Sequence, residues 1–123
     1  MKPELKNFAP HEFLMDGVVV FDRMDADFLL LLDKCREIAG VPMKLNSSWR
    51  SAAKNKAVGG AKSSMHLKGR AVDVRCLDGA HRAAIMGAAL SIGLTVGVME
   101  NALHLDNREK QTVFHYYHMY RRK

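Results

Sequence analysis

The sequence predicts a single α+β domain with a small, largely antiparallel sheet and helices packed on it. Three helical stretches are interspersed with five short runs of β-forming residues along the 123-residue chain, an order of elements typical of this class. A chain of this length forms one ordinary domain, residues 1–123, and can bury a core without disulfide bonds. No internal repeat or linker-like composition divides it.

The first helix is predicted to begin after Asp25 and to end before Gly40. Asp25 can cap its amino end, and Gly40 followed by Pro42 is a typical helix stop. Between these signals, apolar residues recur at helical spacing: Phe28, Leu31, Leu32, Cys35 and Ile38. Residues 1–23 lack such a period and are predicted to be irregular, apart from a short strand at 17–21.

The middle of the chain is predicted to hold two strands separated by a short helix. Residues 43–47 alternate in polarity as a half-buried strand does. A helical stretch at 51–58 stops at the Gly59-Gly60 pair. The strand at 70–76 is rich in β-forming residues, and because side chains alternate along a strand, three of them share one face: Ala71, Asp73 and Arg75.

A second helix is predicted over residues 80–92, where the sequence is rich in alanine. Asp78 is its candidate cap, and Gly93 ends it. Near the carboxyl end of the sequence, residues 112–120 fit a strand or a helix equally well.

A hairpin is predicted between the second helix and the tail. Strands at 94–99 and 102–106 are separated by two residues, Glu100 and Asn101, which is a typical hairpin connection. In the second strand, alternation points three side chains the same way: Ala102, His104 and Asp106.

The composition is that of a soluble globular protein, with 48% hydrophobic and 26% charged residues. The longest apolar run, Phe28–Leu32, is too short to cross a bilayer, and the first residues lack the apolar stretch of a signal peptide. We therefore expect no transmembrane segment and synthesis in the cytoplasm. Cys35 and Cys76 are too few for a disulfide scaffold and are predicted to be buried thiols.

The net charge of +6 favours anionic partners such as acidic cell-wall polymers, membrane surfaces or nucleic acid. The basic residues are dispersed, and neither a DNA-reading helix motif nor a basic stripe interleaved with aromatic residues is present. We therefore expect no nucleic-acid partner.

The stretch "SSMHLKGRAVDV" places His66 and Asp73 seven residues apart, with Gly69 between them. On one helix, residues at this separation lie about 10 Å apart along the axis, and on one flat strand they point to opposite faces. The two side chains can therefore reach one metal ion only if the chain bends between them. Gly69 can supply that bend, with His66 on a loop and Asp73 on the following strand.

A third metal ligand has to come from elsewhere, and His104 is the best candidate because it lies in the middle of an apolar strand. Asp106, on the same face, can orient one of the histidines. A single histidine beside a strand is more often a hydrogen-bonded structural residue, so spacing alone leaves both interpretations open.

The motifs around these residues resemble the zinc D-alanyl-D-alanine carboxypeptidase family, which belongs to the lysostaphin/D-Ala-D-Ala/hedgehog group of metallopeptidases. The family pattern is a Ser-Gly-Tyr-Arg-Ser-like stretch with a nearby Asn, then Ser-x-His-x-x-Gly-x-Ala-x-Asp, then a His followed two residues on by Asp. The matching segments of this chain, within residues 43–108, are Ser47–Ser51 with Asn55, Ser64–Asp73, and His104 with Asp106.

The resemblance implies the fold of that group and a zinc ion bound by His66, Asp73 and His104. Arg50 matches an arginine that in relatives contacts the substrate or stabilises the developing oxyanion. Ser64 is expected to hold the loop of His66 and to lie among the substrate-binding residues.

The general base is less clear from the sequence. Many relatives carry an acidic residue three positions before the last histidine ligand, where this chain has Asn101. Glu100, one residue further back, is the candidate base, although a polar turn residue at this position needs no catalytic role. His115 or His118 is the alternative base; with no base, the zinc would be structural.

The function that the resemblance implies is a zinc-dependent peptidase that hydrolyses peptide bonds of peptidoglycan stem peptides. The family includes small bacteriophage endolysins, so we expect a monomer that acts on the cell wall or in the periplasm after holin-type release. The alternative is a non-catalytic, zinc-stabilised module that binds cell wall or protein.

Overall fold

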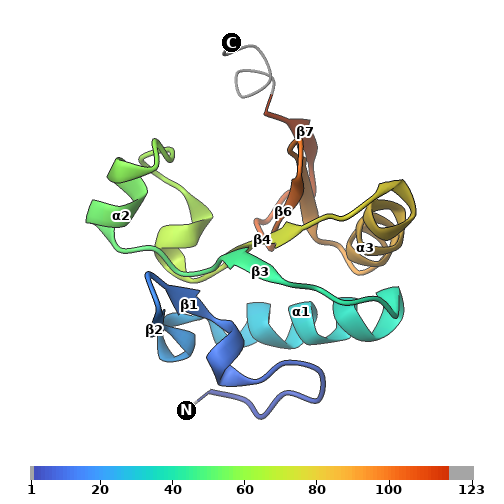
Figure 1. Ribbon diagram of the computed structural model, residues 1–123, viewed down its shortest axis with the longest axis horizontal. Coiled ribbons are helices and arrows are strands. Elements are labelled where there is room, and N and C mark those ends of the chain that lie inside the picture. Colours follow the sequence, from blue (N-terminus) through green and yellow to red (C-terminus); the bar gives the residue numbers. More distant parts are fainter. Residues whose placement is uncertain (1, 117–123) are drawn as a thin grey trace.

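A computed structural model describes residues 2–116 and confirms the α+β class (Figure 1). Its elements lie along the chain in this order: η1 (Pro10–Glu12), β1 (Leu14–Met15), β2 (Val18–Val19), η2 (Phe21–Arg23), α1 (Ala26–Ala39), β3 (Leu45–Ser47), α2 (Ala52–Ala57), η3 (Met65–Lys68), β4 (Ala71–Arg75), α3 (Gly79–Ser91), β5 (Thr95–Val98), β6 (Ala102–Asp106) and β7 (Val113–His115). The label η marks a short 3-10 helix.

The main sheet has five strands in the order β3-β4-β6-β5-β7. Its first four strands pair antiparallel, as predicted, whereas β7 pairs parallel to β5. Residues 112–120, which fitted a strand or a helix equally well, thus begin with a strand at the edge of the sheet. Glu100 and Asn101 form the predicted turn between β5 and β6, since Met99 N donates to the Ala102 carbonyl across it.

Both long helices begin and end close to the predicted positions. The Asp25 carboxylate caps α1 by accepting from Phe28 N at 3.0 Å, and Gly40 ends the helix with a φ of 65°. The Asp78 carboxylate caps α3 by accepting from His81 N at 2.8 Å. Carboxylates at these positions satisfy amide groups that have no partner within the helix.

The core lies on one face of the main sheet, where α1 and α3 pack against the strands and against each other. The strand residues that belong to this core alternate along β4, β5 and β6: Val72, Val74, Val96, Leu103 and Leu105. Leu29 joins Phe28, Leu32 and Cys35 on the buried face of α1, whereas Ile38, predicted to belong to the apolar stripe, is 49% exposed. The intervening strand residues therefore point to the opposite face.

The opposite face of the sheet is where polar residues of β4 and β6 gather. In Figure 1, α2 and α3 lie on opposite sides of the β6–β5–β7 part of the sheet, so the α2 side is the one that the helical core leaves uncovered. Residues 1–23, predicted to be irregular around one strand, contain a two-stranded hairpin and two 3-10 helices in their described part.

Cys35 and Cys76 are buried and free, as predicted. Among the helices of residues 2–116, none combines the length and the apolar character that a membrane crossing would need.

Candidate metal centre

The bend predicted between His66 and Asp73 is present. Ser64 begins η3, and its hydroxyl accepts a hydrogen bond from His66 N at 3.2 Å. Gly69 ends η3 with a φ of 68°, and the chain then enters β4. A Cβ at Gly69 would lie 2.3 Å from the Arg23 carbonyl oxygen, so both the backbone angle and the space require glycine there.

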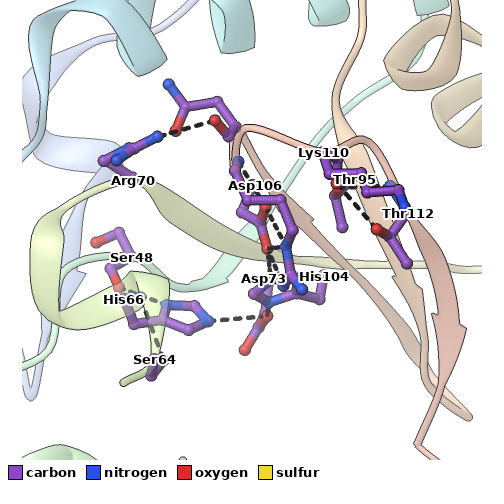
Figure 2. Close-up of polar contacts among 12 residues, drawn as sticks. Ser48, Ser64, His66, Arg70, Asp73, Thr95, His104, Asp106, Lys110 and Thr112 are labelled. Atoms are coloured by element: carbon purple, nitrogen blue, oxygen red, sulfur yellow. Dashed lines mark hydrogen bonds and ion pairs between the residues drawn. The ribbon is translucent and has the colours of Figure 1, made fainter.

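Three side chains that are distant in sequence converge on the polar face of the sheet. Asp73 on β4 is the direct cross-strand partner of His104 on β6, and η3 brings His66 to the same place. Asp73 Oδ1 lies 3.2 Å from His66 Nε2 and 3.1 Å from His104 Nδ1 (Figure 2). One ligand atom from each residue lies within 4.8 Å of the others, so the group could hold a metal ion.

The outer nitrogen of each imidazole has a fixed partner. His66 Nδ1 donates to the Ser48 carbonyl at 2.7 Å, and His104 Nε2 donates to the Asp106 carboxylate at 2.6 Å. These contacts place the proton of each neutral ring on the outer nitrogen. The nitrogens that face Asp73 then carry lone pairs, as metal ligation requires.

This arrangement brings three hydrogen-bond acceptors together, with the two inner ring nitrogens 3.1–3.2 Å from Asp73 Oδ1. Three lone pairs repel one another unless positive charge lies among them. In a metal-free protein, protons have to supply that charge. A metal cation satisfies the same geometry with both rings neutral, so the donor set fits a divalent ion.

Charge within the cluster shifts the pKa values of its members. Burial disfavours the ionised form of Asp73, yet hydrogen bonds with His104 and His66 hold the pKa of that carboxyl well below its usual range. Burial likewise opposes ionisation of Asp106, while His104 and Arg108 lower its pKa. Burial lowers the pKa of His104, but Asp106 and Asp73 raise it by more, so the net shift is upward.

Arg50 lies against the cluster from the β3 side. Its NH2 group donates to Asp73 Oδ2 at 3.0 Å, Nε donates to the Ser47 hydroxyl at 3.1 Å, and NH1 donates to Asn55 Oδ1 at 3.3 Å. Three anchors fix the guanidinium plane and leave two of its five N–H groups for other partners. Arg50 and Ser64, both predicted to bind substrate, line the cavity described next.

A cavity of about 910 Å³ opens over the three candidate ligands. Residues 58–61 and 63–65, which follow α2, form one wall, and Phe114 and Tyr116 lie on the other. His66, Asp73 and His104 all line it. A chamber of this size, bordered by both polar and apolar groups, suits a peptide-sized ligand.

The wall formed by Phe114 and Tyr116, called the aromatic wall below, depends on Gly97. Gly97 on β5 is the cross-strand partner of both His104 and Phe114, so these residues form one row across three strands. A Cβ at Gly97 would lie 2.7 Å from the Phe114 ring and 2.9 Å from the Tyr116 ring. Burial raises the pKa of Tyr116 to about 12, and the charge of Asp73 acts in the same direction.

Glu100, the predicted base, is not brought to the cluster. It is exposed in the β5–β6 turn and is not among the residues that line the cavity. Its backbone carbonyl accepts from Arg82 of α3 at 2.8 Å, which ties the turn to the helical side of the sheet. His115 is exposed on β7 and does not line the cavity either, and His118 lies outside the described residues.

Sequence reasoning missed two arginines that support the site. Arg108, two residues after Asp106, lines the cavity and holds the Asp106 carboxylate through its backbone N–H and its guanidinium, at 2.6–3.2 Å. Arg70, labelled in Figure 2, donates to Asn107 Oδ1 from Nε at 2.7 Å and to the Asn107 carbonyl from Nη2 at 2.9 Å. The Arg70 contact crosses 37 residues, a pairing that local sequence cannot reveal.

The chain is similar to known peptidases in both sequence and structure. The model of a protein family described as Peptidase M15 matches residues 6–106. No curated protein sequence matches the chain significantly. Among solved structures, the chain is similar to the Serratia marcescens L-Ala D-Glu endopeptidase ChiX, with a TM-score of 0.49 and 20% sequence identity over 71% of this chain and 82% of that chain.

Proposed function

Because the chain belongs to the Peptidase M15 family, we propose that it is a zinc-dependent peptidase that hydrolyses peptide bonds in the stem peptides of peptidoglycan. The observation that carries the proposal is the convergence of three lone-pair donors, His66 Nε2, Asp73 Oδ1 and His104 Nδ1, at the floor of a peptide-sized cavity.

The donor set supports zinc in particular. Zinc binds imidazole nitrogen and carboxylate oxygen at about 2.0–2.2 Å in tetrahedral geometry, which separates neighbouring ligand atoms by about 3.3 Å. The two contacts of Asp73 Oδ1, at 3.1 and 3.2 Å, are close to that separation. Three protein ligands leave the fourth position open, as in catalytic rather than structural zinc sites.

When bound, zinc would polarise the scissile carbonyl and supply a water of lowered pKa. The residues of the chain would prepare that chemistry. Ser48 and Asp106 hold the histidine rings with their inner nitrogens toward the cluster. Arg50 balances the charge of Asp73 and offers its remaining N–H groups to the substrate. Arg108 keeps Asp106 ionised and in place.

The charge of the chain segment that contributes Arg50, residues 58–61 and residues 63–66 to the cavity supports an acidic substrate. Residues 38–72, which include α2 and η3, contain no aspartate or glutamate. They contain seven basic side chains: Lys44, Arg50, Lys54, Lys56, Lys62, Lys68 and Arg70. Such a field raises the local concentration of anionic ligands at moderate ionic strength. Peptidoglycan stem peptides carry free carboxylates, so this basic segment suits them.

A turbidity experiment tests the function. Purified peptidoglycan incubated with the protein should clarify, stop clarifying when a chelator is added, and clarify again when zinc is restored. His66→Gln should abolish the effect, whereas His11→Gln, a change of the same type at an exposed position of η1, should not. Mass spectrometry of the released fragments identifies the bond. Clarification that continues unchanged in chelator would exclude the proposal.

A second candidate function is a zinc-stabilised module that binds cell wall without cleaving it. One observation favours it: among the described residues that line the cavity, Asp73 is the only carboxylate, so no acidic general base stands beside the cluster. In this case the zinc-loaded protein would sediment with purified peptidoglycan but release no fragments.

From the resemblance to endolysins we also propose that the protein reaches the wall by holin-type release. Cells that express it should lyse only when a holin is expressed with it; lysis without a holin would contradict this route.

A further inference from the structure

We propose that the Tyr116 hydroxyl is a catalytic hydrogen-bond donor to the carbonyl oxygen of the scissile peptide bond, acting as negative charge develops on that oxygen. The inference rests on the proposed peptidase function and deepens it. The O–H bond of the phenol is not broken in this role. The hydrogen bond from the phenol to the carbonyl oxygen only shortens as that oxygen gains charge.

The first step is to ask which groups around the cavity are able to assist the reaction. Among the described residues that line it, three ionisable side chains remain once the candidate metal ligands are set aside: Arg50, Arg108 and Tyr116. Arg50 is bound to Asp73 and Arg108 to Asp106, so each is engaged with a carboxylate of the cluster. Tyr116 is the one neutral donor among them, because a phenol keeps its proton at neutral pH.

The second step concerns where Tyr116 lies. Its backbone N–H donates to the Val98 carbonyl at 3.1 Å, which extends the pairing of β7 with β5 by one residue. Tyr116 is two positions after Phe114 and so points to the same face of the sheet. Its ring centroid lies 6.3 Å from that of His104 and 5.1 Å from that of Phe114.

The third step concerns how firmly the ring is held. Gly97 lets the edges of the Phe114 and Tyr116 rings lie directly over β5, and the two rings meet edge to face. Phe114 in turn packs against His104 at 5.7 Å between centroids. A ring packed in this way positions its hydroxyl before the substrate arrives, and such preorganised donors contribute most to transition-state stabilisation.

Tyr116 and Arg50 approach the cluster from different walls. Arg50 comes from the segment before α2, next to the wall that follows that helix, whereas Tyr116 belongs to the aromatic wall on the β7 side. A carbonyl placed over Asp73 and His104 would therefore meet a donor on each side.

The test compares Tyr116→Phe with wild type in the full-length, zinc-loaded protein. Tyr116→Phe keeps the ring contacts and removes only the hydroxyl. With soluble muropeptides as substrate, kcat should fall by about 100-fold to 1,000-fold, the loss typical of one oxyanion donor. KM, zinc content and melting temperature should stay as in wild type. Val113→Ala, an exposed change on the same strand, should retain full activity.

The outcomes separate this inference from the proposed function. If wild type hydrolyses muropeptides and Tyr116→Phe does so at the same kcat, the role of Tyr116 is excluded while the peptidase function stands. A rise in KM at constant kcat, or a loss of zinc or of thermal stability that accounts for the lower rate, would also exclude it. If the zinc-loaded wild type hydrolyses nothing, both proposals are wrong.

Discussion

Asp73 and His104 face each other across β4 and β6 as a direct register pair, and one oxygen of Asp73 lies 3.1 Å from His104 Nδ1. Their proximity is a property of the sheet, because a slip of one residue in this pairing would send one of the two side chains to the core face. The same alternation that buries Val72 and Leu103 thus aims Asp73 and His104 at the cavity.

Asp106→Ala should weaken zinc binding by about 10-fold to 100-fold, the usual effect of removing a residue that orients a ligand. Asp106 accepts from His104 Nε2 at 2.6 Å, so without it the ring can rotate or change tautomer. A competition titration with a chromogenic chelator measures the affinity. Asp22→Ala, a change at an exposed carboxylate, is the control. An unchanged zinc affinity in Asp106→Ala would show that the hydrogen bond does not orient His104.

The ligand set was accessible from the sequence because its signals are local or periodic. Gly69 marks the bend, and alternation along two strands puts Asp73 and His104 on polar faces. The resemblance joined these separate pieces. The position of His104 opposite Asp73 follows from strand register, which the sequence does not state.

The aromatic wall was not predictable for a different reason. The segment that contains Phe114 and Tyr116 fits helix and strand equally, and its pairing with β5 is parallel and distant in sequence. Glu100 was the candidate base because many relatives carry an acidic residue one position later. The structure places it in the β5–β6 turn, outside the cavity, because a strand separates successive residues by about 3.3 Å.

Glu100→Ala should therefore leave the rate of peptidoglycan hydrolysis within about twofold of wild type. The Glu100 side chain is exposed, and what ties the turn to α3 is its backbone carbonyl, which the substitution keeps. The measurement is kcat on soluble muropeptides, made beside Tyr116→Phe. A large loss of kcat in Glu100→Ala, with zinc content preserved, would mean that the turn moves toward the cluster when substrate binds.

Removal of zinc should lower the melting temperature and the free energy of unfolding. A ligand that binds only the folded state stabilises it by about 2.7 kcal/mol when present at about 100 times its Kd. Here the ion would also relieve repulsion between Asp73 Oδ1 and the two ring nitrogens that lie 3.1–3.2 Å from it. Thermal unfolding with chelator, and after zinc is restored, measures the effect. His66→Gln, which lacks one ligand, should respond far less than wild type to added zinc.

The stability of the zinc-free protein should fall as the pH rises from about 6 to about 8. Burial lowers the pKa of His104, but Asp106 and Asp73 raise it further, to a value above the 6.5 of an unfolded chain. The folded state then holds a proton that the unfolded state releases, so this contribution is complete below pH 6.5 and is lost as the pH passes the raised pKa.

Zinc should reverse that pH trend, because the ion replaces the proton and binds more tightly as its ligands deprotonate. Denaturant midpoints at the two pH values, with chelator and with zinc, check both signs. A chelated protein that becomes more stable toward pH 8 would contradict the proton balance assigned to His104.

Gly97→Ala should separate zinc binding from catalysis. The added methyl group would lie 2.7 Å from the Phe114 ring and 2.9 Å from the Tyr116 ring, so both rings have to move away from β5. β7 is an edge strand and can shift, so we expect a loss of about 1–3 kcal/mol in folding free energy, as for other overpacked sites. The three candidate ligands lie on η3, β4 and β6 and should still bind zinc with wild-type stoichiometry, whereas kcat should fall because the Tyr116 hydroxyl is displaced.

Gly87→Ala is the matched control, since a Cβ there meets no atom within 4 Å and alanine favours the helix. Full activity in Gly97→Ala would mean that the aromatic wall need not lie against β5 for the reaction to proceed.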